Sequence, residues 1–186
     1  MRTTRRPQPR PASSQSVVLI GFMGSGKSMV GRLVAGRMGY DFSDSDTLVS
    51  VRAAMSIPEI FERHGEPWFR AAETRELERL TDRSGLVLAT GGGVPTIPEN
   101  IPLLRRIGLI IWLTASNDVL WERVSRNKNR PLLHTEDPRG TLEQLIAART
   151  PIYESIADQR IDSTHLRHGE AADAVIQALE NANVGA

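Results

Sequence analysis

Short apolar runs alternate along the chain with segments whose apolar residues recur every three or four positions. Runs of about four residues rich in Val, Ile and Leu are typical of strands buried on both faces of a parallel sheet. They predict strands at residues 17–20, 86–89 and 109–113, a further strand that ends near Asp44, and a short strand at about 160–162.

The segments between these runs have helical periodicity. Apolar residues predict a helix that begins near Lys27 and ends at Gly39, and Ser56 and Pro58 predict the start of another. Residues 126–138 are polar, basic and rich in proline, which indicates a loop. Further helices are expected at about 66–82, at 117–125 after a cap at Ser116, at 141–153 with a kink or break at Pro151, and at 170–180.

Alternating strands and helices predict a three-layer α/β/α sandwich around a parallel five-stranded sheet, in a single domain over residues 16–186. Ligands of such sheets bind beyond the carboxyl ends of the strands. Gly21, Asp44, Asp46 and Gly91 all lie at or just past predicted strand ends. We therefore expect these four residues to meet at one edge of the sheet.

Composition narrows the class of protein. The chain has 186 residues, enough for one domain with a core. Its net charge of +1 argues against a general binder of nucleic acids. The absence of cysteine excludes disulfides, thiolate zinc sites and cysteine nucleophiles. No apolar run approaches the roughly 18 residues of a membrane span, so no membrane association is expected.

Residues 1–15 differ from the rest of the chain, because they contain four arginines, three prolines and no acidic residue. Such a segment buries too little apolar surface to stay ordered, which predicts a disordered tail. A transit peptide is the alternative interpretation, since those segments are also rich in Arg and Ser and poor in acidic residues.

The chemistry begins with GFMGSGKS at residues 21–28, which fits the phosphate-loop pattern G-x-x-x-x-G-K-[ST]. Its backbone N–H groups and the following helix would hold the phosphates of ATP. Lys27 would reach the β- and γ-phosphates, and the Ser28 hydroxyl would bind Mg²⁺. The predicted nucleotide-binding residues here are Gly24, Ser25, Gly26, Lys27, Ser28 and Met29. The loop does not identify the phosphate acceptor.

Asp44 and Asp46 place two carboxylates at the end of a predicted strand. One can face the Mg²⁺–phosphate cluster and the other can face the acceptor, although aspartates also serve as ordinary turn and helix-cap residues.

Three further features have two interpretations each. Arg70, beside Glu66 and Glu73, is either a solvated ion pair or a clamp for a substrate carboxylate.

The triple glycine at Gly91, Gly92 and Gly93 is either a flexible turn or a place where backbone approaches a ligand. A run of basic residues lies before and within the 126–138 loop and comprises Arg123, Arg126, Lys128 and Arg130. Such a run indicates a solvated surface or a surface that binds nucleic acid. The alternative is a mobile lid that closes over the nucleotide.

Together these motifs resemble the shikimate kinases, small phosphate-loop enzymes. The ordered series is GFMGSGKS, DSD, FRAAE, GGG, NRPLL and RTPIY, which spans about residues 17–162. The resemblance implies transfer of the γ-phosphate of ATP to the 3-hydroxyl of shikimate in aromatic amino-acid biosynthesis, by a monomeric cytoplasmic enzyme that uses Mg²⁺. It further implies a substrate-binding helical region at about 46–75 and a lid at about 126–138.

The resemblance also implies roles for individual residues. Lys27, Asp46 and Arg130 would be catalytic, with Asp46 a candidate base and Arg130 a lid arginine that contacts phosphate. Asp44 would lie near the metal with Ser28, and Arg123 near adenine. The residues that correspond to shikimate-binding positions are Asp46, Arg70, Gly91, Gly92, Gly93 and Arg149, with Phe61 and Phe69 lining the ring. Because Arg149 would be a second arginine for one carboxylate, the resemblance favours the clamp interpretation of Arg70.

Residues 163–169 depart from the family pattern, since the expected arginine and proline are missing there; Arg167 is a candidate substitute. Trp68 also stands where a smaller or polar residue is common. The alternatives are a kinase of another small acceptor, such as gluconate or a nucleoside, and a non-catalytic nucleotide-binding homologue. Arg70 and Arg149 argue against a nucleoside acceptor, and retention of Lys27 and Asp46 argues against a non-catalytic protein.

Overall fold

The computed structural model describes residues 15–126, 133 and 135–184. The predicted tail, apart from Gln15, lies outside these residues. So does the central part of the predicted lid, including Arg130.

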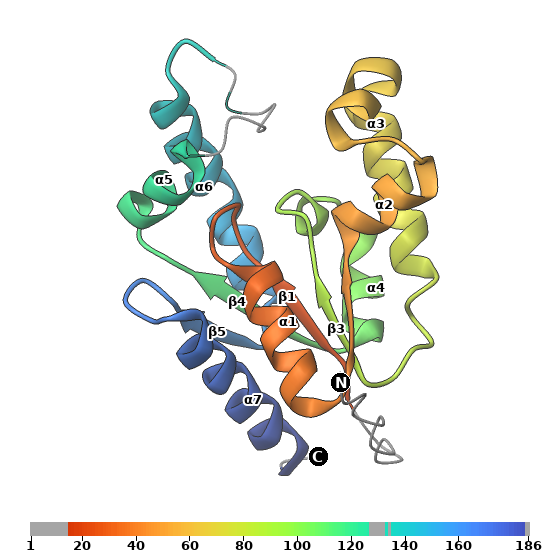
Figure 1. The fold of residues 1–186 in the computed structure, drawn as a ribbon, viewed down its shortest axis with the longest axis vertical. Coiled ribbons are helices and arrows are strands. Elements are labelled where there is room, and N and C mark those ends of the chain that lie inside the picture. Colours follow the sequence, from red (N-terminus) through yellow and green to blue (C-terminus); the bar gives the residue numbers. More distant parts are fainter. Residues whose placement is uncertain (1–14, 127–132, 134, 185–186) are drawn as a thin grey trace, which may run out of the picture.

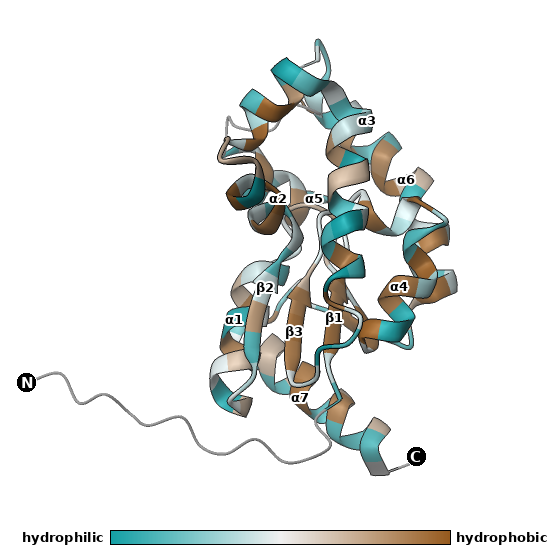
Figure 2. Ribbon diagram, turned by 90° about the vertical axis from the view of Figure 1, so that its right-hand side faces the viewer, coloured by the Kyte–Doolittle hydropathy of each residue, from teal (hydrophilic) through white to brown (hydrophobic). Residues whose placement is uncertain are grey.

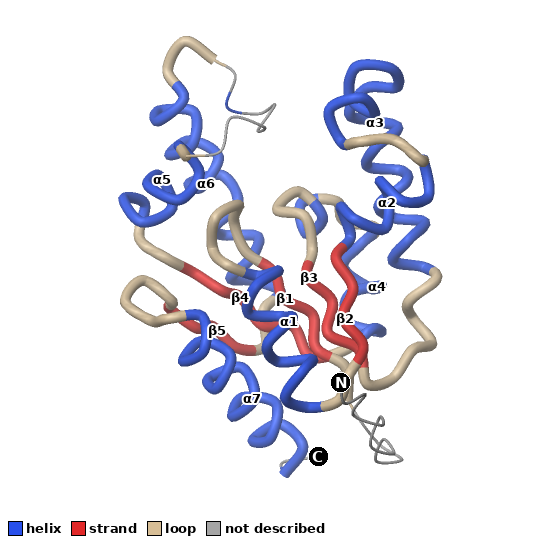
Figure 3. The backbone as a smooth tube through the Cα atoms, in the orientation of Figure 1, coloured by secondary structure: helices blue, strands red, loops and turns tan. Residues whose placement is uncertain are grey.

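A parallel sheet forms the centre of the molecule, in the strand order β2-β3-β1-β4-β5 (Figure 3). Its strands are β1 (Val17–Ile20), β2 (Asp41–Asp44), β3 (Leu86–Ala89), β4 (Leu109–Thr114) and β5 (Gln159–Asp162). The five-stranded parallel sheet is thus confirmed, and the predicted strand bounds hold to within a residue at the ends of β4 and β5.

Helices cover both faces of the sheet, which confirms the three-layer arrangement (Figure 1). Successive side chains of a strand point to opposite faces. Val17 and Leu19 therefore pack in one cluster with α1 (Lys27–Met38) and α7 (His168–Val184). Val18 and Ile20 pack in the other cluster, with α4 (Asn100–Ile107), α6 (Pro138–Ile156) and the end of α3 (Ile57–Glu78). Both strand faces are apolar for this reason, and β1 and β3 are correspondingly brown in Figure 2.

Two helical regions lie beyond the sheet edge on either side of the loop between β1 and α1 (Figure 1). One comprises α2 (Ser45–Ala53) and the first part of α3, which share a small apolar cluster of Val49, Ile60, Phe69 and Ala72. The other comprises α5 (Asn117–Ser125) and part of α6. None of the described helices combines the length and apolar character that a membrane span requires.

The predicted helix starts agree closely with the structure. α1 begins at Lys27, and Gly39 ends it in the left-handed conformation with φ 69°. Ser56 caps α3 in a capping box with Glu59, and Ser116 caps α5. These positions were predictable because each depends on a local sequence signal.

Two helix predictions hold in part. The helix expected at 66–82 begins as predicted, after a kink where Gly65 has φ 77°, but the Pro58 helix and this one form a single element, α3, which ends at Glu78. The helix expected at 141–153 is part of α6, which passes through Pro151 without a break and continues to Ile156. Proline removes one backbone donor, but buried Tyr153 and Ile156 hold the last turn in the core.

Helix α4 was not predicted, because the proline-interrupted segment around it has no long apolar period. Its Pro102 lies in the first turn, where backbone N–H groups have no partner within the helix. Buried Asn100 joins this helix to its neighbours: its amide donates to Val94 O at 3.0 Å, and its Oδ1 accepts from Thr74 Oγ1 at 2.8 Å.

Candidate active site

The phosphate loop connects β1 to α1 as predicted. Gly24 and Gly26 have φ values of 82° and 92°, a region that favours glycine. Lys27 is buried, and its Nζ donates to the carbonyl oxygens of Gly21 and Phe22, both at 2.8 Å. The loop thus holds a cation beside the first backbone N–H groups of α1, an arrangement that suits a nucleotide's phosphates.

Ser28 and Asp44 lie together next to the phosphate loop. Ser28 Oγ donates to Asp44 Oδ2 at 2.6 Å. The other oxygen of Asp44 caps α2, since Asp46 N donates to Oδ1 at 3.1 Å. Asp44 is therefore a helix cap that also contacts Ser28, the residue predicted to bind the metal.

This pair suits Mg²⁺, which prefers oxygen ligands and commonly keeps water and phosphate oxygens in the rest of its shell. Among the residues that the structure describes, no group of three or more acidic or histidine side chains forms a protein-only metal site. A bound nucleotide would therefore have to supply part of the coordination.

Asp46 lies in the first turn of α2, facing the triple glycine. A Cβ atom added at Gly91 would lie 2.4 Å from Asp46 Oδ1 and 2.7 Å from Glu73 Oε1. Between the two aspartates, Ser45 is buried, and its hydroxyl accepts from Gly91 N at 2.7 Å. The side chains of DSD thus diverge: Asp44 reaches the phosphate loop, and Ser45 and Asp46 reach the glycines.

Arg70 is held on three sides in the second part of α3. Its Nη1 donates to Glu73 Oε2 at 2.6 Å, and its Nε and Nη2 donate to Glu66 Oε1 at 3.1 Å and 2.7 Å. Its guanidinium packs on Gly93, where a Cβ would approach Cζ to 2.5 Å. Burial alone would lower the pKa of Arg70, but its two carboxylate partners raise it, so the guanidinium stays charged.

Arg149 approaches the same glycine loop from α6. A Cβ added at Gly92 would lie 3.4 Å from its Nη1, and its guanidinium lies 5.6 Å from the Phe22 ring centroid. Two arginines from different helices thus flank consecutive glycines. Both cations therefore lie beside one small region next to Asp46.

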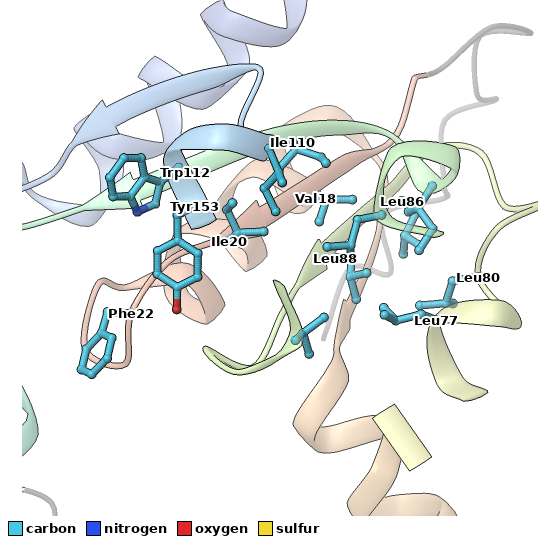
Figure 4. Close-up of a cluster of buried hydrophobic side chains, with 14 of the residues drawn as sticks. Val18, Ile20, Phe22, Leu77, Leu80, Leu86, Leu88, Ile110, Trp112 and Tyr153 are labelled. Carbon is cyan, nitrogen blue, oxygen red and sulfur yellow. The ribbon is translucent and has the colours of Figure 1, made fainter. Parts of the chain in front are cut away.

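Tyr153 also belongs to this region, although sequence reasoning gave it no role. Its hydroxyl donates to Gly92 O at 2.5 Å, while its ring packs near Trp112 and Ile20 in the core (Figure 4). Burial raises the pKa of Tyr153 to about 12, against the opposing charge of Arg149, so the hydroxyl remains a donor. Its position four residues after Arg149, on the same helix face, was the available signal.

Phe61 and Phe69 contact each other with ring centroids 5.0 Å apart. Phe69 is buried in the cluster that joins α2 to α3, and Phe61 is partly buried against it. Arg70 lies 5.4 Å from the Phe69 ring centroid, so the apolar cluster adjoins the arginine.

The nucleotide end has contacts on both sides of the phosphate loop. Arg123 Nη1 donates to Gly24 O at 3.1 Å. From the other side, Ser163 Oγ donates to Ser25 O at 3.4 Å, and His168 lies beside Gly26. Met29 is half exposed on α1 just after the loop. The segment that lacked the family's arginine and proline therefore still reaches the loop, through Ser163 and His168.

The comparisons with known proteins agree with these observations. The family model described as shikimate kinase matches residues 23–180. A shikimate kinase of Rhodopseudomonas palustris is 48% identical over 165 residues, which cover 89% of this chain and 81% of the relative. One of Cupriavidus pinatubonensis is 45% identical over 167 residues, 90% of this chain and 87% of the relative.

A solved structure of shikimate kinase from Acinetobacter baumannii in complex with shikimate has a TM-score of 0.87 and 37% sequence identity. It covers 91% of this chain and 94% of that chain.

Proposed function

Because the chain belongs to the shikimate kinase family, we propose how its own residues carry out that family's reaction. The chain is a phosphotransferase that moves the γ-phosphate of ATP to the 3-hydroxyl of shikimate. The predicted resemblance, fold class and activity are therefore confirmed. The roles of individual residues, the metal and the oligomeric state are proposals.

Arg70 and Arg149 bind the carboxylate of shikimate. The observation that carries this assignment is their convergence on Gly92 and Gly93 from two different helices. Arg70 is already oriented by Glu66 and Glu73, so little side-chain entropy remains to be lost when it binds. A planar guanidinium can pair with a carboxylate through two hydrogen bonds, which fixes the direction of the substrate as well as its position.

Asp46 accepts hydrogen bonds from the hydroxyl groups at the other end of the substrate. It lies over Gly91, next to the glycines that face the arginines. The acceptor oxygen would then lie between Asp46 and the phosphate loop. Phosphoryl transfer has a loose transition state, so orienting this hydroxyl contributes more than strong proton abstraction. Asp46 accepts the proton late in the transfer. The partly buried Phe61 and buried Phe69 support the ring of the substrate from α3.

Lys27, with the glycines and Ser25 of its loop, holds the β- and γ-phosphates. Ser28 and Asp44 hold Mg²⁺ together with phosphate oxygens and water. The metal, when bound, neutralises charge that builds on the phosphate oxygens. Arg123 supports the adenine side through its contact with Gly24 O. Arg130, outside the described residues, is proposed to reach the transferred phosphate from the lid.

Release of ADP from ATP and Mg²⁺ tests the acceptor, with shikimate compared against quinate, gluconate and nucleosides. We expect turnover with shikimate to exceed the no-acceptor background by at least about a hundredfold, since binding and orientation of both substrates supply most of the catalysis. Equal rates with gluconate would contradict the acceptor assignment. We propose a monomer, as the family resemblance implies; light scattering during size-exclusion chromatography measures this.

A further inference from the structure

Glu73 is the most completely buried acidic side chain of the site, with no exposed side-chain surface. One of its oxygens, Oε2, accepts from Arg70 Nη1 at 2.6 Å. The other, Oε1, receives no hydrogen bond from any described residue. It lies beside Gly91, as Oδ1 of Asp46 does, and the two carboxyl groups interact with each other. A buried oxygen without a donor costs free energy, so this contact requires a physical explanation.

The neighbouring donors are already used. Gly91 N donates to Ser45 Oγ at 2.7 Å. Arg70 Nε and Nη2 donate to Glu66 Oε1. The glycine leaves no room for another group, because even a Cβ there would overlap both carboxyl oxygens. What faces Glu73 Oε1 is therefore the carboxyl group of Asp46, which is an acceptor when ionised.

Two ionised carboxylates in contact repel each other, whereas one proton between them makes a strong hydrogen bond. We propose that Glu73 carries this proton and donates it as a hydrogen bond to the Asp46 carboxylate, which makes Glu73 a positioning residue that holds Asp46 toward the acceptor hydroxyl. The inference rests on the role proposed above for Asp46.

The charges around Glu73 agree with this assignment. The groups that act on it are Arg70 on its own helix, which also pairs with Glu66, and Asp46 on α2. From α6, Arg149 and Tyr153 lie at the neighbouring Gly92. The pKa of Glu73 is raised from 4.5 to about 7, chiefly by burial; Arg70 opposes the rise, and the charge and hydrogen bond of Asp46 add to it. The neutral acid is therefore populated below about pH 7 despite the adjacent guanidinium.

A neutral Glu73 leaves the negative charge on Asp46, the residue that meets the substrate. The hydrogen bond fixes the orientation of the Asp46 carboxylate toward the acceptor. When Glu73 ionises, the two carboxylates repel each other and Asp46 loses this orientation. Binding and turnover of shikimate should then fall as the pH rises through the pKa of Glu73, while the affinity for ATP should not change.

The test compares Glu73→Gln with Glu73→Ala over a pH series. Glutamine places an amide N–H where the protonated acid has its O–H, so the variant should keep kcat/KM for shikimate within about threefold of wild type at pH 6, and should lose the alkaline limb near pH 7. Alanine should lower kcat/KM for shikimate about 10- to 100-fold, as expected for one hydrogen bond to a charged group, with KM for ATP unchanged. A glutamine variant as poor as alanine, or one that keeps the alkaline limb, overturns the proposal.

Two controls separate this inference from the proposed function. Glu76→Gln replaces another buried glutamate of α3, which pairs with Arg52 and Arg79 away from the site. This variant should keep the wild-type pH profile. Asp46→Asn tests the role of Asp46 itself. If Asp46→Asn stays active, the proposed role of Asp46 fails, whereas a failure of Glu73→Gln alone overturns only the inference about Glu73.

Infrared difference spectroscopy tests the proton without relying on activity. Wild type should have a carboxylic-acid C=O band below pH 7 that disappears at alkaline pH and is missing from Glu73→Gln. A band that persists in Glu73→Gln would belong to another group and would contradict the assignment.

Discussion

Replacing Glu73 with glutamine should remove a pH dependence from the stability of the folded chain. The carboxyl group has a pKa of about 7 in the folded state, raised from 4.5. A group whose pKa is raised on folding binds its proton more tightly in the folded chain. Its contribution to stability is therefore complete below about pH 4.5 and is lost as the pH rises to about 7.

The size of the effect follows from the two pKa values. At about 1.36 kcal/mol for each pH unit, the rise from 4.5 to about 7 makes wild type lose about 3 kcal/mol of unfolding free energy from this group. Glutamine does not ionise. The free energy of unfolding of Glu73→Gln, relative to wild type, should therefore increase by about 3 kcal/mol between about pH 4.5 and pH 8.

Urea denaturation at a series of pH values, followed by tryptophan fluorescence, measures this difference. The slopes against urea must agree between the two proteins, so that a change in midpoint reports stability. Only the change with pH is predicted, because replacing the protonated acid with an amide alters local hydrogen bonds and adds an offset that does not depend on pH. A difference that stays within about 0.5 kcal/mol over the whole interval would refute the reasoning, since Glu73 would then ionise as it does in the unfolded chain.

Three other substitutions test separate contacts of the site. Arg70→Lys should raise KM for shikimate about 10- to 100-fold and leave KM for ATP within twofold, because the point charge of lysine cannot replace the planar guanidinium group. An equal rise in KM for both substrates in steady-state kinetics would show that the role of Arg70 is structural. Tyr153→Phe removes the donor to Gly92 O, so KM for shikimate should rise several-fold and the free energy of unfolding, measured by urea denaturation, should fall by about 1 to 3 kcal/mol. An unchanged KM with a lower stability would show that Tyr153 contributes only to packing. Asp44→Asn should increase the Mg²⁺ concentration for half-maximal activity about tenfold or more, as measured by titration at fixed ATP. An unchanged Mg²⁺ requirement would show that Asp44 does not help to bind the metal.

The features that depend on neighbouring residues could be predicted from the sequence. The apolar run at 17–20, the glycine-rich loop and Gly39 place β1 and α1 because each signal is local. The capping box at Ser56 and Glu59 is equally local. The helix does not break at Pro151, because the local cost of proline is outweighed by buried contacts of Tyr153 and Ile156, which the periodicity does not reveal.

The functional site shows the same difference between local sequence signals and contacts that join distant parts of the chain. Residue types and their order made Lys27, Asp46 and Arg70 candidates for the site. The motif series predicted the family, which is confirmed, and the resemblance added Arg149 to the candidates. Sequence spacing placed Glu73 beside Arg70 but could not show that it also meets Asp46, because that contact joins α2 to α3 across a glycine. Tyr153 was missed for a similar reason, since its hydrogen bond to Gly92 spans 61 positions.

The location of the transferred phosphate tests the central claim most directly. Phosphorus and proton NMR of a reaction with ATP, Mg²⁺ and shikimate would identify the product. We predict one phosphomonoester attached at the 3-hydroxyl of shikimate, formed in equal amount to ADP. ADP accompanied only by inorganic phosphate, or a phosphate on a different hydroxyl, would contradict the placement of the acceptor between Asp46 and the phosphate loop.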